Sequence, residues 1–209
     1  ASGVCAHNEG GRGVAEQLWL NANGMTPGAA MAQPAGSRAR ISTRSIGKSE
    51  NPQGEHTYPV LLVNFSDVAF SITNPVDTFK RHFNEKGYSG GGAAGSVSDY
   101  FKAQSNGIYS PAFDVACVVT LSKPRAYYGA RTGGSNDSHV SEMVKEAVSL
   151  AETQGVNFTK YKSSTGNVPL VGVVFAGVGE NSSWEDDAVW SSFYTTPTAF
   201  TGGRISSFL

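Results

Sequence analysis

Residues 58–209 carry patterns of hydrophobic and polar positions that predict a sheet with helices packed on it. Nearly continuous apolar runs over Pro59–Phe65 and Val168–Ala176 are typical of strands covered on both faces. Partial alternation over Phe113–Val119 predicts another strand, and Gly202–Leu209 reads as a turn followed by a strand. Together these segments predict four strands.

A first helix is predicted between Asn74 and Gly87. Asn74 suits the N-cap position, and Gly87 suits the residue that stops a helix. Between them, Val76, Phe79 and Phe83 recur three and four positions apart and form one apolar stripe. This stripe predicts that one face of the helix packs on the sheet.

Two further helices follow. Ser96–Asp99 has the spacing of a capping box, and Asn106-Gly107 ends the helix that it opens. Asn136–Ser138 is predicted to cap the third helix, which has apolar residues at helical spacing over Val140–Ala151 and closes at Gly155. These strands and helices together predict a sheet with helices packed on it.

Residues 1–57 lack such periodicity and are interpreted as an extended leader or arm, with one short helix at Val14–Asn21. The domain prediction is therefore an arm over residues 1–57 and a folded domain over residues 58–209. The chain ends on two large apolar residues, Phe208 and Leu209, which favours a break inside a structural element because natural termini are usually polar.

Composition narrows the function classes. The 209 residues carry a net charge of −1 with 16% charged residues, which argues against nucleic-acid binding by bulk charge. The sequence contains no run of 18 apolar residues, so no membrane-spanning segment is predicted. The low charge and the 25 glycines weakly favour an exported protein. Cys5 and Cys117 are two independent thiols or one disulfide, and the sequence leaves both open.

Two motif candidates carry little chemistry. Gly90, Gly92 and Gly95 match G-x-G-x-x-G, but a helix precedes them where a dinucleotide site needs a strand, so a flexible loop is expected. An acidic cluster at Glu180 and Glu185–Asp187, flanked by Trp184 and Trp190, is interpreted as a solvated loop. Calcium binding, or a surface for a protein or sugar, is the alternative for this cluster.

Several segments in order resemble the amino-terminal half of the M6 metallopeptidases, the immune-inhibitor-A-like secreted bacterial proteases. The resemblance covers about residues 58–190, and its most specific part runs from the Ser-Asp-Tyr-Phe motif to the Tyr-Tyr-Gly motif. The segments are Pro59–Asp67, Gly95–Phe101, Gln104–Gly107, Pro111–Val115, Val119–Ser122, Ala126–Gly129, Met143–Ala147, Val156–Tyr161 and Val173–Gly177.

The resemblance implies an α+β fold of the zincin-like kind, in which helices back a twisted mixed sheet and the active-site helix packs beneath. It also implies proteolytic ancestry and export from a bacterium, to the medium or the cell surface. The zinc helix of the family, H-E-x-x-H, is absent, because no two of His7, His56, His82 and His139 are four positions apart. We therefore assign no catalytic, cofactor-binding or metal residue in 1–209, and expect zinc only if a longer protein supplies the ligands.

The sequence departs from the family in two further places. Lys162–Asn167 contains no carboxylate where the family often has an Asp-rich loop, and Trp190–Ser192 replaces the family's Trp-Pro-His. Two interpretations remain open: a truncated metallopeptidase, or an inactive relative. The alternative from another class is a non-catalytic surface module that binds protein or glycan through the acidic, Trp-containing loop 180–190. Protein or peptide partners are expected, without further identification.

Overall fold

The computed structural model describes residues 53–131, 137–183, 185 and 187–209. The chain divides between Asn51 and Pro52 into two units, and all the described residues belong to the second. The predicted arm and its helix at Val14–Asn21 lie outside the described residues. The described helices and strands are β1 (Gly54–Asn64), α2 (Pro75–Asn84), η3 (Gly90–Gly92), α3 (Val97–Gln104), β2 (Tyr109–Thr120), α4 (Arg125–Tyr128), α5 (Val140–Thr153), η4 (Phe158–Tyr161), β3 (Val168–Phe175), α6 (Glu180–Ser183), β4 (Thr198–Phe200) and β5 (Gly203–Phe208).

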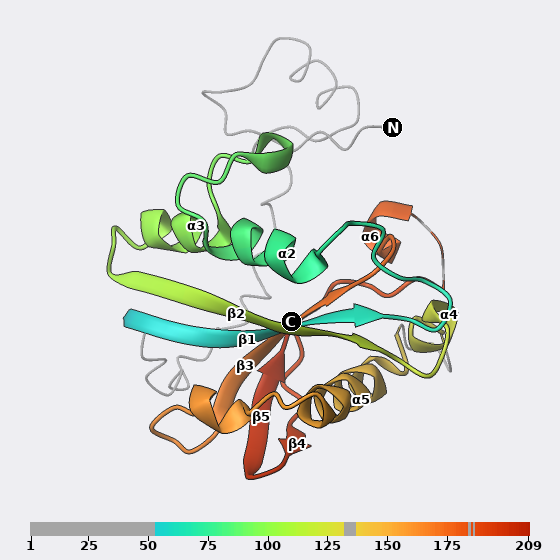
Figure 1. The fold of residues 1–209 in the computed structure, drawn as a ribbon. Coiled ribbons are helices and arrows are strands. Elements are labelled where there is room, and N and C mark those ends of the chain that lie inside the picture. Colours follow the sequence, from blue (N-terminus) through green and yellow to red (C-terminus); the bar gives the residue numbers. More distant parts are fainter. Residues whose placement is uncertain (1–52, 132–136, 184, 186) are drawn as a thin grey trace, which may run out of the picture. The chain divides into compact units, whose positions relative to one another are not determined.

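The strands form one twisted five-stranded sheet in the order β2-β1-β3-β5-β4 (Figure 1). Strands β2, β1, β3 and β5 run parallel, and the edge strand β4 is antiparallel to β5. The sheet is thus mixed, and with its helices it forms a mixed arrangement of α and β elements that is compatible with the expected α+β class. Strand β1 lies inside the sheet, and Val60–Val63 is at most 1% exposed, which confirms a strand covered on both faces.

Helices cover the two faces of β1 and β2 (Figure 1). On one face, the stripe of Val76, Phe79 and Phe83 on α2 packs against Val60 and Leu62. On the other face lies α5, whose inward stripe is fully or almost fully buried against the main core. That stripe consists of Val140, Met143, Val144, Ala147, Val148 and Ala151.

The predicted start of α3 and the predicted end of α5 are confirmed, and both are determined by residues close together in sequence. Ser96 and Asp99 form both halves of the predicted capping box of α3. Helix α5 ends at Thr153, and Gly155 follows with φ +88°, a conformation that a residue with a side chain rarely adopts. The start of α3 and the end of α5 therefore agree with the sequence pattern.

Of the two predicted ends of α2, the first is confirmed and the second is wrong. Asn74 occupies the N-cap position, although it adopts a left-handed conformation, φ 51°, and makes no side-chain cap bond. The helix ends at Asn84, before Gly87, because the Asn84 side chain pairs with the backbone of Phe113 on β2 through two 2.8 Å hydrogen bonds. Gly87 instead donates its N–H to the Asp99 carboxylate at 2.7 Å.

The predicted cap of α5 was also wrong. His139 occupies the N-cap position and makes no side-chain cap bond. Asp137 turns away from the helix, because its carboxylate accepts the N–H of Trp190 at 3.1 Å. Asn136 lies outside the described residues.

Strand boundaries extend beyond the apolar runs. Strand β1 begins at Gly54 rather than at Tyr58, because the polar residues Glu55–Thr57 pair through their backbones with Ser110–Ala112 of β2 while their side chains stay exposed. The three-residue strand β4 was missed, since so short a segment shows no periodicity. Among the described residues, no helix is long and apolar enough to cross a membrane.

Candidate functional site

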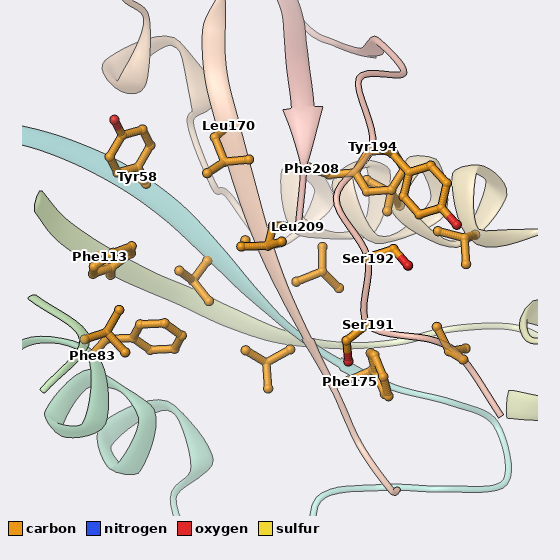
Figure 2. A pocket seen from close by; sticks show the side chains of 18 of the residues that line it. Tyr58, Phe83, Phe113, Leu170, Phe175, Ser191, Ser192, Tyr194, Phe208 and Leu209 are labelled. Carbon is orange, nitrogen blue, oxygen red and sulfur yellow. The ribbon is translucent and has the colours of Figure 1, made fainter. Parts of the chain in front are cut away.

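An apolar pocket of about 470 Å³ opens beside β3, near the end of β5 (Figure 2). Its walls come from segments far apart in sequence: β1 and β2, helices α2, α3 and α5, strand β3, and the segment 189–194. The lining residues are Tyr58, Val60, Phe83, Val97, Phe101, Tyr109, Phe113, Val140, Met143, Val144, Leu170, Gly172, Val173, Val174, Phe175, Val189, Trp190, Ser191, Ser192, Tyr194, Phe208 and Leu209.

The pocket exists because β3 is longer than its pairing with β5. The paired register ends at Val171 opposite Phe208. Leu209 adds two backbone bonds, donating to Val171 at 3.1 Å and accepting from the N–H of Val173 at 2.7 Å. Among the described residues, no strand pairs with Val174 and Phe175 on the side away from β1. The end of β3, half-buried and unpaired on this side, therefore forms the centre of the pocket.

One wall of the pocket is the segment 189–194. It is attached at two ends by backbone bonds: Val189 accepts the N–H of Glu180 at 3.1 Å, and Tyr194 bridges to Phe208 with bonds of 2.9 and 3.0 Å. The Tyr194 ring also stacks on Phe208 with centroids 5.2 Å apart. Between these points, Trp190 is 45% exposed.

The polar groups that line the pocket are poorly suited to acid–base or metal chemistry at neutral pH. The Tyr109 hydroxyl donates to that of Tyr58 at 2.9 Å, and burial together with this bond raises the pKa of Tyr109. Ser191 and Ser192 contribute hydroxyls, and none of the described lining residues is a His, Cys, Asp, Glu or Lys. The pocket is suited to hold apolar groups.

No metal centre was found in the described part of the chain: no three His, Cys, Asp or Glu side chains come together there. Of the histidines, His139 stacks on Tyr127 with centroids 4.3 Å apart and lies 3.3 Å from the Glu142 carboxylate. His7 lies outside the described residues. The segment Lys162–Asn167 closes on itself, with the N–H of Ser163 donating to Asn167 at 2.9 Å.

The interpretation of the acidic cluster as solvated holds for Glu185 and Asp187, which are exposed, but is wrong for Glu180. Glu180 is 7% exposed and pairs with Arg131. Glu185 pairs with Arg125, whose side chain is 18% exposed. Because arginines pair with Glu180 and Glu185, these two carboxylates offer less free charge to calcium. Trp184 and Asp186 lie outside the described residues.

Two further groups of titratable side chains are structural. Asp114 accepts the Tyr161 hydroxyl at 2.7 Å and the Lys160 ammonium at 2.9 Å. Burial and the bond to Asp114 raise the pKa of Tyr161 to about 12. Burial also raises the pKa of the Cys117 thiol, which makes it a poor nucleophile. Both alternatives for Cys117, an independent thiol or a disulfide with Cys5, stay open, since Cys5 lies outside the described residues.

Comparison with known proteins identifies the family. The family model for the catalytic domain of the immune inhibitor A peptidases, M6, matches residues 59–204. The chain belongs to this M6 peptidase family. This confirms the resemblance seen in the sequence. The matched residues include all five strands in whole or in part, and all the residues that line the pocket apart from Tyr58, Phe208 and Leu209.

The relatives are much longer than this chain. Two pre-pro-metalloproteases named PrtV, from Vibrio cholerae serotype O1 strains M66-2 and ATCC 39315 (El Tor Inaba N16961), are each 28% identical over 130 residues. The aligned stretch covers 52% of this chain and 14% of each relative. The similarity therefore concerns a part of an M6 catalytic domain.

Proposed function

We propose that this chain supplies the sheet and supporting helices of a zincin-like M6 metallopeptidase domain, and that its pocket seats the helix that carries the zinc ligands. The observation that carries the proposal is the apolar pocket at the uncovered end of β3, in a chain that belongs to a peptidase family. An amphipathic helix would bury its apolar face there, and burial stabilises such an association by about 25 cal/mol per Å².

The metal and the general base of such a site come from outside residues 1–209. A catalytic zinc takes three protein ligands and a water, and the H-E-x-x-H helix supplies two of the ligands and the base. The spacing of the four histidines rules out this motif within the chain. When bound, zinc would lower the pKa of its water and polarise the peptide carbonyl; the residues that line the pocket would position the metal helix.

Secretion is part of the same proposal. The two PrtV relatives are named pre-pro-metalloproteases, and such names denote precursors with segments ahead of the mature enzyme. We place the protein outside the bacterial cell, in the medium or at the surface. Periplasmic retention of the natural gene product in a fractionation experiment would contradict this placement.

A pair of matched variants of the natural gene product tests whether the pocket binds the zinc-carrying helix. Leu209 lines the pocket and is 58% exposed, so Leu209→Asp should leave the described fold intact while placing a charge where the helix packs. Val178→Asp is the control, since Val178 is 50% exposed and does not line the pocket. We expect Leu209→Asp alone to lose bound zinc and chelator-sensitive casein hydrolysis. Equal zinc content and equal activity in both variants would disprove the proposal that the pocket binds the zinc-carrying helix.

A binding module remains the competing function. The exposure of Trp190 and of Phe193, 45% and 58%, favours it, since exposed aromatic rings mark contact surfaces. The pairing of Glu180 and Glu185 with arginines weakens it, because the proposed acidic surface then carries less free charge. Under this alternative, the natural product binds a protein or glycan and contains no stoichiometric zinc.

A further inference from the structure

Two carboxyl groups are buried behind the pocket wall formed by residues 189–194. Asp137 is 6% exposed and Glu180 is 7% exposed. Buried carboxylates are rare unless they are paired, because an ionised group loses its hydration on burial. In this protein one arginine, Arg131, forms the ion pair with Glu180.

Both carboxyl-bearing residues are tied to the wall. The Asp137 carboxylate accepts the N–H of Trp190 at 3.1 Å, across 53 positions of sequence. The backbone N–H of Glu180 donates to the carbonyl of the preceding wall residue, Val189, at 3.1 Å. The wall therefore rests on the same two residues that carry the buried charge.

The charge at this point is incompletely compensated. The second carboxylate oxygen of Glu180, Oε2, is buried and has no hydrogen-bond partner within the described part of the chain. Burial and the charge of Glu180 raise the pKa of Asp137 above its ordinary value, while the Trp190 N–H and Arg131 act in the opposite direction. Within the described ranges, these groups act most strongly on the ionisation of Asp137.

We propose that Asp137, buried with the charge of Glu180, is a pH-sensitive latch: protonation of the Asp137 carboxyl tightens the wall of residues 189–194 against the pocket, and its ionisation loosens the wall. The latch does not depend on what fills the pocket. Two adjacent buried negative charges with one arginine repel each other, and a proton on Asp137 removes that repulsion. The Trp190 N–H keeps its acceptor, because a protonated carboxyl group still offers an oxygen.

The direction follows from linkage. We call the wall closed when Trp190 is bonded to Asp137, and open when the wall is loosened and Asp137 is hydrated. A carboxyl group whose pKa is raised by burial binds its proton more tightly in the closed wall than in the open wall. The extra stability of the closed wall is complete below the pKa of the free side chain, 3.8, and is lost as the pH rises through the raised value in the folded protein. Closing is therefore favoured on acidification.

Hydrogen exchange of the peptide that contains Trp190 and Ser191 tests the latch in the purified chain. After correction for intrinsic exchange, protection should be greater at about pH 4.5 than at about pH 7.5. The expected ratio is at most on the order of ten for each unit by which the raised pKa of Asp137 exceeds 4.5. Asp137→Asn is the decisive variant, because asparagine tolerates the left-handed backbone at this position, φ 51°, and keeps an acceptor for Trp190.

Asp137→Asn should show high protection at both pH values and no difference between them. Glu185→Gln is the control from the same loop, since Glu185 is partly exposed and pairs with Arg125; it should retain the wild-type pH difference. Circular dichroism checks that each variant folds. The latch is disproved if protection in the wild type does not rise on acidification, or if Asp137→Asn keeps the wild-type pH difference.

Discussion

Removing the hydroxyl of Tyr128 tests how the core is joined to α5. The ring is fully buried, with its centroid 5.8 Å from that of Phe65, and its hydroxyl donates to Glu146 at 2.5 Å. The other carboxylate oxygen of Glu146 accepts the N–H of Ser122 at 2.7 Å. Tyr128→Phe keeps the ring, so the measured loss reports the bonds of the hydroxyl: the strong one to the Glu146 carboxylate, and those it accepts from the Ser122 side chain and the Lys123 backbone.

A hydrogen bond to a charged group contributes about 1.5–3 kcal/mol, and the partial exposure of Glu146 favours the lower end. We expect Tyr128→Phe to lower the free energy of unfolding by about 1.5 kcal/mol, and Tm by roughly 3–6 °C. Denaturant titration of the purified chain measures the free energy, and the m value should stay unchanged.

The effect should depend on pH. Burial alone would raise the pKa of Glu146, but the bonds from Tyr128 and from the Ser122 amide hold it below its ordinary value. A lowered carboxyl pKa stabilises the fold above the pKa of the unfolded chain, and this stability is lost as the pH falls through the lowered value. The difference in the free energy of unfolding between wild type and Tyr128→Phe should therefore be largest at pH 7 and decrease below about pH 4.

The adjacent tyrosine is the matched control. The hydroxyl of Tyr127 donates to Glu142 at 3.0 Å, but the Glu142 side chain is 51% exposed. Water replaces such a bond readily, so Tyr127→Phe should cost less than Tyr128→Phe. Two results would refute the reasoning: equal losses in the free energy of unfolding for the two variants, or a loss for Tyr128→Phe that is constant from pH 7 to pH 3.

Three further variants test other parts of the structure. Gly129→Ala should lower the free energy of unfolding by about 1–3 kcal/mol in a denaturant titration, because its Cβ would lie 2.4 Å from the carbonyl oxygen of Asp187; an unchanged midpoint would contradict this close approach. Asp114→Asn should lose up to about 1 kcal/mol at pH 7 and less in acid, since bonds from Tyr161 help to hold the pKa of Asp114 low; a loss that grows on acidification would contradict it. Trp190→Ala should reduce binding on a protein or glycan array only if the chain is a binding module, and wild-type binding by this variant counts against that function.

The sequence predicted the elements whose periodicity is long or uninterrupted. Helix α5 was predictable because six inward residues recur at helical spacing over Val140–Ala151. Strands β1 and β3 were predictable because Val60–Val63 and Val168–Phe175 are continuous apolar runs. The edge strand β4 was not, since three residues carry no period and its place depends on pairing with β5.

The pocket and the latch could not be predicted in the same way. The pocket brings Tyr58 together with Tyr194, which no local pattern relates. Asp137 resembles a helix cap in sequence, but a tertiary hydrogen bond to Trp190 decides where its side chain points. Glu180 resembles a solvated acid, and its burial depends on Arg131 and on the fold of the loop around it.

The metal content of the protein tests the central claim most directly. Zinc is measured by plasma mass spectrometry in purified residues 1–209 and in the natural gene product, whose intact mass is determined on the same sample. We predict one zinc per natural chain, a mass well above 21.9 kDa, and no stoichiometric zinc in residues 1–209. One zinc bound by residues 1–209, or chelator-sensitive casein hydrolysis by that chain alone, would contradict the account.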